Sequence, residues 1–127
     1  MHENEIAKQI VDSAFRVHKS LGPGLLENVY QAALAYELTN RGLKIQLERG
    51  IPAEYEGVRL EVGFRADIIV ENKVIIECKS VEALAPVHSK ILLTYLRLAD
   101  MRLGLLINFN VELVKDGIRR VVDRLVE

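Results

Sequence analysis

Three charged side chains interrupt two apolar segments near the middle of the chain. The segments read RADIIV and VIIECKS, are joined by a short polar turn, and carry Asp67, Glu77 and Lys79. Alternate residues of a β-strand point to the same face, so Glu77 and Lys79 share one face of the second segment. Two adjacent carboxylates repel each other unless a cation lies between them or one stays protonated. These residues therefore define the candidate chemistry.

The pairing of the two segments decides whether Asp67 joins the other two charges. A hairpin that matches buried face to buried face places Ile68 opposite Ile76, and Asp67 then lies opposite Glu77. This register requires a three-residue connection, or a bulge beside a two-residue turn. The sequence thus predicts one patch of sheet that holds two carboxylates and an ammonium group.

The chemistry that such a patch could support is metal-assisted hydrolysis of a phosphodiester. Hard oxygen ligands suit Mg²⁺, with Mn²⁺ as a substitute, and such ions keep several waters and a substrate phosphate in their coordination shells. A lysine beside the ion could lower the pKa of the attacking water or stabilise charge on the phosphate. The alternative is a solvated cross-strand salt bridge, because a Glu-x-Lys pattern alone has low specificity.

Length and composition predict one domain over residues 1–127. Half of the residues are apolar and 28% are charged, as in an ordinary globular domain. The apolar runs are too short for a membrane span, and the N-terminus is acidic and amphipathic where a signal peptide is basic and then apolar. We therefore expect a cytoplasmic protein without membrane contact. The net charge is −1, so any nucleic-acid surface must be local.

Periodicity predicts an α/β sandwich, with a central mixed β-sheet flanked by helices. Apolar residues at helical spacing predict helices over residues 3–21, 25–41 and 86–99. Strands are predicted over residues 43–47, 51–55, 62–70, 74–80 and 103–109, and residues 111–126 are ambiguous between strand and helix. In the second helix the pattern predicts one apolar stripe of Leu26, Val29, Ala33 and Tyr36, and a flanking stripe of Glu27, Tyr30, Gln31, Leu34 and Leu38.

The combination of motifs resembles a known group of proteins. Asp67 followed by Glu77-Cys78-Lys79, after a helix that carries Glu27, is similar to the PD-(D/E)XK nuclease superfamily. Within it, GLLENVY at residues 24–30 resembles the signature of the GxxExxY family. The resemblance covers almost the full length, and its other elements are His18-Lys19, Leu21-Gly22-Pro23-Gly24, Tyr55-Glu56, Arg65-Ala66, Val87-His88, Leu93-Thr94-Tyr95-Leu96, Leu106-Ile107-Asn108-Phe109-Asn110 and Asp116-Gly117-Ile118.

This resemblance implies a restriction-endonuclease-like core and Mg²⁺-dependent cleavage of nucleic acid, with DNA a better candidate than RNA. It implies that Asp67, Glu77 and the backbone carbonyl of Cys78 hold the metal ion. Glu27 would hold a second metal ion or its water, and Lys79 would position the nucleophile.

One departure from the family supports a second interpretation. Relatives carry a Gln four residues before Tyr95, where this chain has Ile91. An apolar side chain cannot bind a phosphate or orient a water. The alternative is therefore a catalytically inactive module that keeps the fold and binds nucleic acid or a protein partner.

Further residues are candidates for nucleic-acid contact or for support of the site. His18 and His88 could act as general bases or could cap helix ends. Tyr30 and Tyr95 could contact substrate or complete the core. Arg65 lies two residues before Asp67 and is predicted to share its strand face.

Three predictions concern the surface, the core and the oligomeric state. A basic C-terminal cluster could bind phosphates or form a solvated face interrupted by Asp116 and Asp123. Cys78 has no partner for an internal disulfide and is predicted to pack in the core. A homodimer with two sites for two strands is compatible with this small chain, although no sequence feature requires it. The basic cluster comprises Lys115, Arg119, Arg120 and Arg124.

Overall fold

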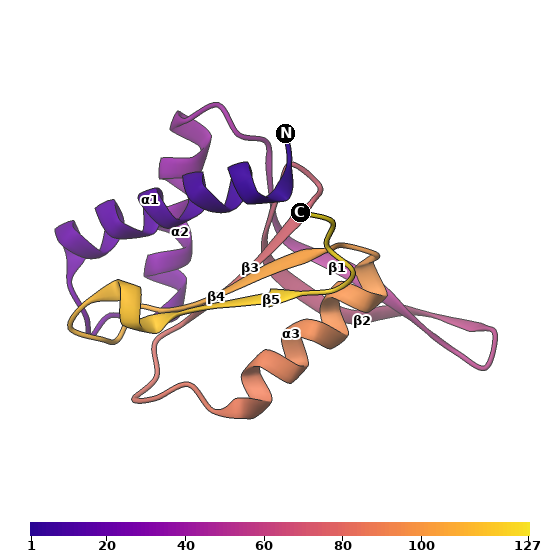
Figure 1. Cartoon of the computed structure of the whole chain (residues 1–127). Helices are drawn as coiled ribbons and strands as arrows, with labels where there is room; N and C mark the ends of the chain where they lie inside the picture. The colour runs from indigo at the N-terminus through magenta and orange to yellow at the C-terminus, as the bar shows by residue number, and fades with distance from the viewer.

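A mixed β-sheet separates the helices into two layers in the computed structural model, which describes residues 1–127 (Figure 1). The strand order is β1-β2-β3-β4-β5, and only β3 and β4 pair in parallel. The predicted α/β fold with a mixed sheet is therefore confirmed. In chain order the elements are α1 (Glu3–Leu21), α2 (Glu27–Asn40), β1 (Ile45–Tyr55), β2 (Val58–Val70), β3 (Val74–Lys79), α3 (Pro86–Ala99), β4 (Leu103–Asn108), the 3₁₀ helix η1 (Val114–Gly117) and β5 (Ile118–Val122).

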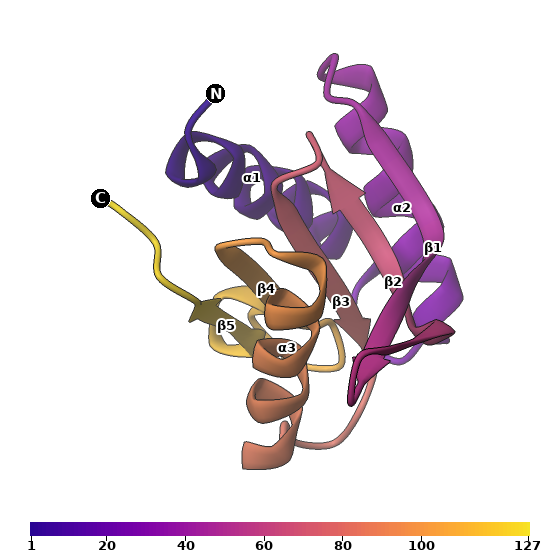
Figure 2. The same cartoon turned by 90° about the vertical axis from the view of Figure 1, so that its right-hand side faces the viewer.

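Each face of the sheet has its own core. Helices α1 and α2 cover one face and α3 covers the other, as Figure 2 shows from the side. The larger core lies under α1 and α2 and includes Ile10, Leu34 and Ile76, whereas the smaller one lies under α3 and includes Ile75 and Leu92. Strands β3 and β4 are covered on both faces, which explains their nearly continuous apolar sequences.

The first two strands form a long ribbon that projects beyond α3 (Figure 1). The sequence predicts separate strands at 43–47 and 51–55, but β1 is continuous over Ile45–Tyr55 because it pairs with β2 along most of its length. The predicted turn at Glu56-Gly57 is confirmed, and both residues have positive φ. Val62, predicted on the buried face of the next strand, is exposed on this ribbon.

Helix α2 packs on the sheet through the stripe that was predicted to flank the apolar one. Its buried residues are Tyr30, Leu34, Ala35 and Leu38, whereas Tyr36 of the predicted apolar stripe is 67% exposed. The helix is apolar around most of its circumference, so periodicity could not distinguish the stripes. Contact with the sheet distinguishes them, because Tyr30 stacks on Phe109 beyond the end of β4.

The C-terminal region, ambiguous in the sequence, forms η1 and the edge strand β5. The two chain ends lie side by side, and the ring of His2 bonds the carbonyl of Val126 (Figure 1). No helix of the structure combines the length and the apolar character that a membrane crossing requires.

Candidate active site

The β2–β3 hairpin stops being a regular ladder at its charged residues. Ile68 pairs with Ile76, as predicted, and this is the last ladder pair before the charged rung. The connection is closed by a hydrogen bond from the Lys73 N–H to the Val70 carbonyl, 3.0 Å long, with Glu71 and Asn72 at positive φ. Apolar matching therefore sets the register that brings the charges together.

Beyond that pair, two carboxylates replace the missing backbone partners. The Asp67 N–H donates to Glu77 Oε2, and the Cys78 N–H donates to Asp67 Oδ2, each over 2.9 Å. The side chains thus cross between the parting strands, and each uses one oxygen for this purpose. The second oxygen of each carboxylate accepts no hydrogen bond from the protein and remains free for a ligand.

The alternate side chains of the β1–β2 ribbon switch from one face of the sheet to the other at the rung that contains Asp67. On β2, Ala66 belongs to the core under α3, whereas Ile68, two residues later, belongs to the core under α1 and α2. On β1, Ile51 packs in the α3 core and Ile45 against the other, so the same change occurs there. Simple alternation therefore fails at this rung, and the shared face of Arg65 and Asp67 stays a prediction.

Burial gives the two carboxylates unusual proton affinities. The side chain of Glu77 is buried, with the residue 8% exposed, and burial together with the charge of Asp67 raises its pKa from 4.5 to about 8. Burial likewise raises the pKa of Asp67. Lys79 lowers both pKa values, but its effect is smaller than that of burial. Without a cation, Glu77 therefore retains its proton at neutral pH, and a bound cation would favour the ionised pair.

A small cleft of about 80 Å³ connects the charges to α3. Tyr95 stacks on Phe64 with ring centroids 3.8 Å apart, which fixes its ring beside the cleft. Burial raises the pKa of Tyr95, and the charges of Glu77 and Asp67 contribute. Ile91 also lines the cleft and adds an apolar side chain to its wall. The cleft is lined by Glu77, Lys79, His88, Ile91, Leu92, Tyr95 and Leu106.

Glu27 reaches the site from the first turn of α2. Its Oε2 accepts a hydrogen bond from the Ser80 N–H, 3.2 Å long, and the Ser80 hydroxyl donates to the Leu25 carbonyl over 2.6 Å. These bonds fasten the start of α2 to the residue that follows Lys79. The charge of Glu27 contributes to the raised pKa of Asp67, although the side chain itself is exposed.

Two of the predicted candidates support the scaffold instead of facing the carboxylates. The Tyr30 hydroxyl donates to the Gly22 carbonyl at 2.6 Å and accepts from the Leu25 N–H at 3.1 Å, so it closes the loop before α2. His18 is buried, and its Nε2 lies 2.9 Å from the Val111 carbonyl. The Tyr of the GLLENVY motif therefore holds the loop that presents Glu27.

The His88 side chain caps the start of α3 and also lines the cleft. The Ala85 N–H donates to its Nδ1 at 2.9 Å, while the His88 N–H donates back to the Ala85 carbonyl at 3.0 Å. This pair caps the start of α3. It also makes Nδ1 an acceptor, so the neutral ring carries its proton on Nε2. The ring lines the cleft beside Glu77 and Lys79.

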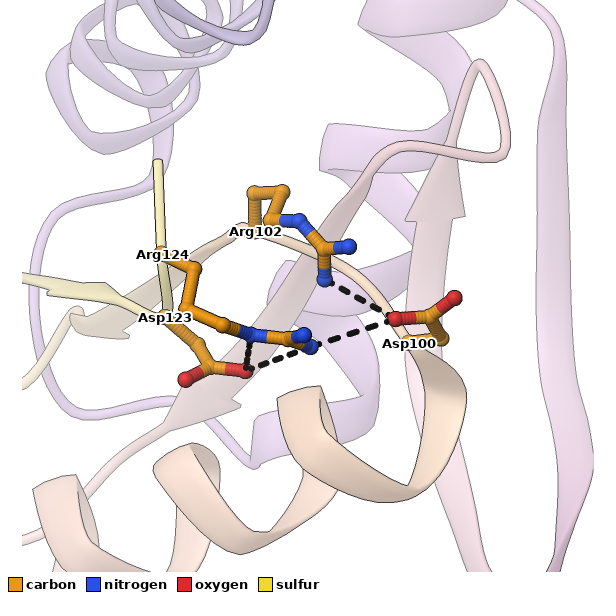
Figure 3. Close-up of polar contacts among 4 residues, drawn as sticks. All are labelled: Asp100, Arg102, Asp123 and Arg124. Carbon is orange, nitrogen blue, oxygen red and sulfur yellow. Dashed lines mark hydrogen bonds and ion pairs between the residues drawn. The ribbon is translucent and has the colours of Figure 1, made fainter. Parts of the chain in front are cut away.

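Two of the four residues of the basic C-terminal cluster, Arg120 and Arg124, form ion pairs. Figure 3 shows Arg124 bonded to Asp123 and Asp100, and Arg102 bonded to the same Asp100. The hydrogen bond from Arg102 is the main cause of the lowered pKa of Asp100. Arg120 pairs with Glu127. Lys115 and Arg119 form no ion pair, and Arg119 bonds the carbonyls of Asp116 and Ile118. Phosphate contact by this cluster therefore stays a prediction.

A family comparison agrees with this geometry. The model of the PD-(D/E)XK nuclease superfamily matches residues 4–121. The chain belongs to this superfamily. Its members are nucleases that generally use divalent metal ions, so nuclease activity is the activity that membership suggests. The narrower GxxExxY assignment stays a prediction from the sequence.

A solved structure supports the fold of this PD-(D/E)XK domain. The chain is similar to a structure described as "Crystal structure of SSO0001", with a TM-score of 0.61 and 22% identity. The match covers 79% of this chain and 52% of the other, so this chain spans about half the length of that protein. No curated protein matches the sequence.

The donor set of this PD-(D/E)XK site fits a hydrated divalent cation. No group of three or more His, Cys, Asp and Glu side chains is arranged to hold a metal ion. The buried Glu77 and the half-buried Asp67 nevertheless supply two carboxylates with one free oxygen each. Mg²⁺ is commonly bound by one or two carboxylates, with water and substrate phosphates in the remaining positions.

One charged residue near the site has no counterpart in the sequence predictions. Glu48 lies in β1 at the rung of Asp67, and its charge raises the pKa values of Asp67 and Glu77. It falls between the two strands predicted from the sequence, where nothing in the pattern distinguished it. Only the pairing of β1 with β2 brings it to the site.

Proposed function

We propose that this chain is a metal-dependent nuclease that hydrolyses phosphodiester bonds in nucleic acid, DNA in preference to RNA. The observation that carries the proposal is the crossed pair of the half-buried Asp67 and the buried Glu77, beside Lys79 at the point where β2 and β3 part. A carboxylate pair with raised pKa values is unfavourable without a cation, and functional sites are where such arrangements concentrate.

Asp67, Glu77 and the Cys78 carbonyl would hold Mg²⁺, or Mn²⁺ as a substitute. The bound ion would act as a Lewis acid toward the phosphate and lower the pKa of a coordinated water. The free oxygens of the two carboxylates are the ones available for this purpose. Their second oxygens bond the Cys78 and Asp67 N–H groups and hold both side chains in place.

The remaining residues would bind and orient the substrate. The Lys79 ammonium lies at the end of β3 and would stabilise charge that develops on the phosphate and position the nucleophile. Glu27, held by Ser80, would accept a proton from a water or bind a second ion's water. Tyr95 and His88 present an O–H and an N–H from α3, which are donors suited to phosphate oxygens.

The experiment that tests this function uses labelled single-stranded, duplex and branched DNA, and RNA, with Mg²⁺ or Mn²⁺. We expect cleavage by the natural chain, and none in EDTA or by Glu77→Gln. Glu61→Gln is the matched control, because this carboxylate is exposed on the ribbon and pairs only with Arg59. Stable binding without cleavage by both the natural chain and Glu77→Gln would instead establish the inactive binding module.

The setting of this activity follows from the same proposal. We propose that residues 1–127 act as one domain in the cytoplasm, where nucleic acid is available. A homodimer would place two sites on two strands, and light scattering at the concentrations used for cleavage would show whether it forms.

A further inference from the structure

Glu48 lies directly across the β1–β2 ribbon from Asp67. The pairs on either side are Leu47 with Ile68 and Arg49 with Ala66, whereas Glu48 and Asp67 are not a ladder pair themselves. Glu48 has a φ of 51°, in the left-handed region that is uncommon for such a residue. The ribbon changes face at this rung, so both acidic residues leave the regular alternation together.

A contact from α2 fixes the direction of the Glu48 carboxylate. Gln31 Nε2 donates to Glu48 Oε1 over 3.0 Å. Gln31 follows Glu27 by four residues, so the two side chains lie on the same face of α2. The Glu48 carboxylate is therefore held on the side of the sheet from which Glu27 approaches the site.

No basic side chain compensates the charge of Glu48. None of the ion pairs includes it. The adjacent Arg49 bonds Gln46 and Asn72 instead. The field of Glu48 reaches Asp67 and Glu77, since its charge contributes to their raised pKa values. Glu48 is exposed, so its carboxylate can bind the hydration waters of a cation held at Asp67 and Glu77.

We propose that Glu48 is a positioning residue of the active site. Its carboxylate binds water molecules of the divalent cation that Asp67 and Glu77 hold, and Gln31 orients it. This inference rests on the proposed function. It adds a fourth carboxylate, from a different strand, to the site formed by Asp67, Glu77 and Glu27. A purely structural role, in which the Gln31–Glu48 bond only ties α2 to β1, is the competing account.

Titration calorimetry with Mn²⁺ alone separates the two accounts. Glu48→Gln keeps a side chain that can bond Gln31 but removes the charge. We expect its Kd for Mn²⁺ to rise five- to tenfold, about 1 to 1.4 kcal/mol, with unchanged stoichiometry. Glu61→Gln should bind as the natural chain does, and Glu77→Gln should not bind. Urea unfolding of each variant shows that the chain remains folded.

A reversed pair provides a second test. The double variant Gln31→Glu/Glu48→Gln exchanges the two side chains of this contact. The carboxylate then lies on α2 and the amide on β1, so the contact still joins one carboxylate and one amide. We expect this double variant to regain a Kd within about threefold of the natural value, as a charge effect requires. In cleavage, Glu48→Gln should raise the Mg²⁺ concentration for half-maximal rate by the same factor as the Kd, with less change in the rate at saturating Mg²⁺.

The outcomes distinguish this inference from the proposed function. If the natural chain binds Mn²⁺ and Glu77→Gln does not, but Glu48→Gln binds as tightly as the natural chain, the inference on Glu48 is wrong and the proposed function stands. If the natural chain binds no Mn²⁺ and cleaves no substrate, both are wrong.

Discussion

Glu77→Gln should stabilise the metal-free protein at alkaline pH while it abolishes catalysis. Glu77 is buried beside Asp67, and these two causes raise its pKa from 4.5 to about 8. At pH values between about 4.5 and 8, Glu77 has lost its proton in the unfolded chain but retains it in the folded chain. The free energy of unfolding must therefore fall as pH rises through this interval. Below about pH 4.5 both states hold the proton, and the effect is absent.

The magnitude follows from the displacement of the pKa. Each pKa unit corresponds to about 1.4 kcal/mol, so the natural chain loses at most about 5 kcal/mol between the two values. Asp67 also has a raised pKa, and the coupling of the two carboxylates lowers the part of the change that belongs to Glu77 alone. Glutamine keeps an oxygen that can accept the Asp67 N–H but carries no charge. Above pH 8, we expect the free energy of unfolding of Glu77→Gln to exceed that of the natural chain by about 2 to 5 kcal/mol.

The assay is urea unfolding in EDTA at a series of pH values from about 5 to 9. The relevant quantity is the difference in the free energy of unfolding between Glu77→Gln and the natural chain, because it cancels the titration of unrelated groups. This difference should grow with pH and level off above about pH 8. A constant difference, or a variant less stable than the natural chain at pH 9, would refute the account of a buried, uncompensated carboxylate.

Three further predictions address the cation, the loop and the catalytic ammonium. Mn²⁺ should raise the Tm of the natural chain more at pH 8 than at pH 6, because a proton competes for Glu77 at the lower pH, and calorimetric scans showing equal shifts would contradict this. Tyr30→Phe should lower the free energy of unfolding by about 1 to 3 kcal/mol, since it leaves the Gly22 carbonyl and Leu25 N–H without their partner; urea midpoints identical to those of the natural chain would count against that role. Lys79→Met should lower the single-turnover cleavage rate by about 100-fold or more and retain Mn²⁺ binding, because the ammonium acts on the phosphate and not on the ion; a variant that cleaves normally would remove Lys79 from the mechanism.

The sequence predicted those parts of the site that depend on local patterns. The apolar alternation of Ile68 and Ile76 determines the hairpin register, and the register places Asp67 against Glu77. Helix α3 has the predicted bounds because Pro86 is favourable only at its start. These features follow from short segments, in which few competing arrangements exist.

Other features depended on contacts between distant segments. The buried stripe of α2 could not be chosen from its sequence, because both stripes contain several apolar residues, and packing such as the stack of Tyr30 on Phe109 distinguishes them. The change of face in β2 at Asp67 also has no signal in the alternating sequence. A left-handed glutamate such as Glu48 carries no sequence signal, unlike a glycine at such a position. Its place in the site became visible only through the pairing of β1 with β2.

The central claim is that Asp67 and Glu77 form a metal-dependent phosphodiesterase site. Single-turnover cleavage of labelled duplex and branched DNA, by the natural chain and by Glu77→Gln in Mn²⁺, tests it most directly. The variant is expected to be the more stable protein at pH 8, so unfolding would not explain a loss of activity. The account predicts cleavage by the natural chain that EDTA stops, and none by Glu77→Gln. Equal cleavage by both proteins would contradict it.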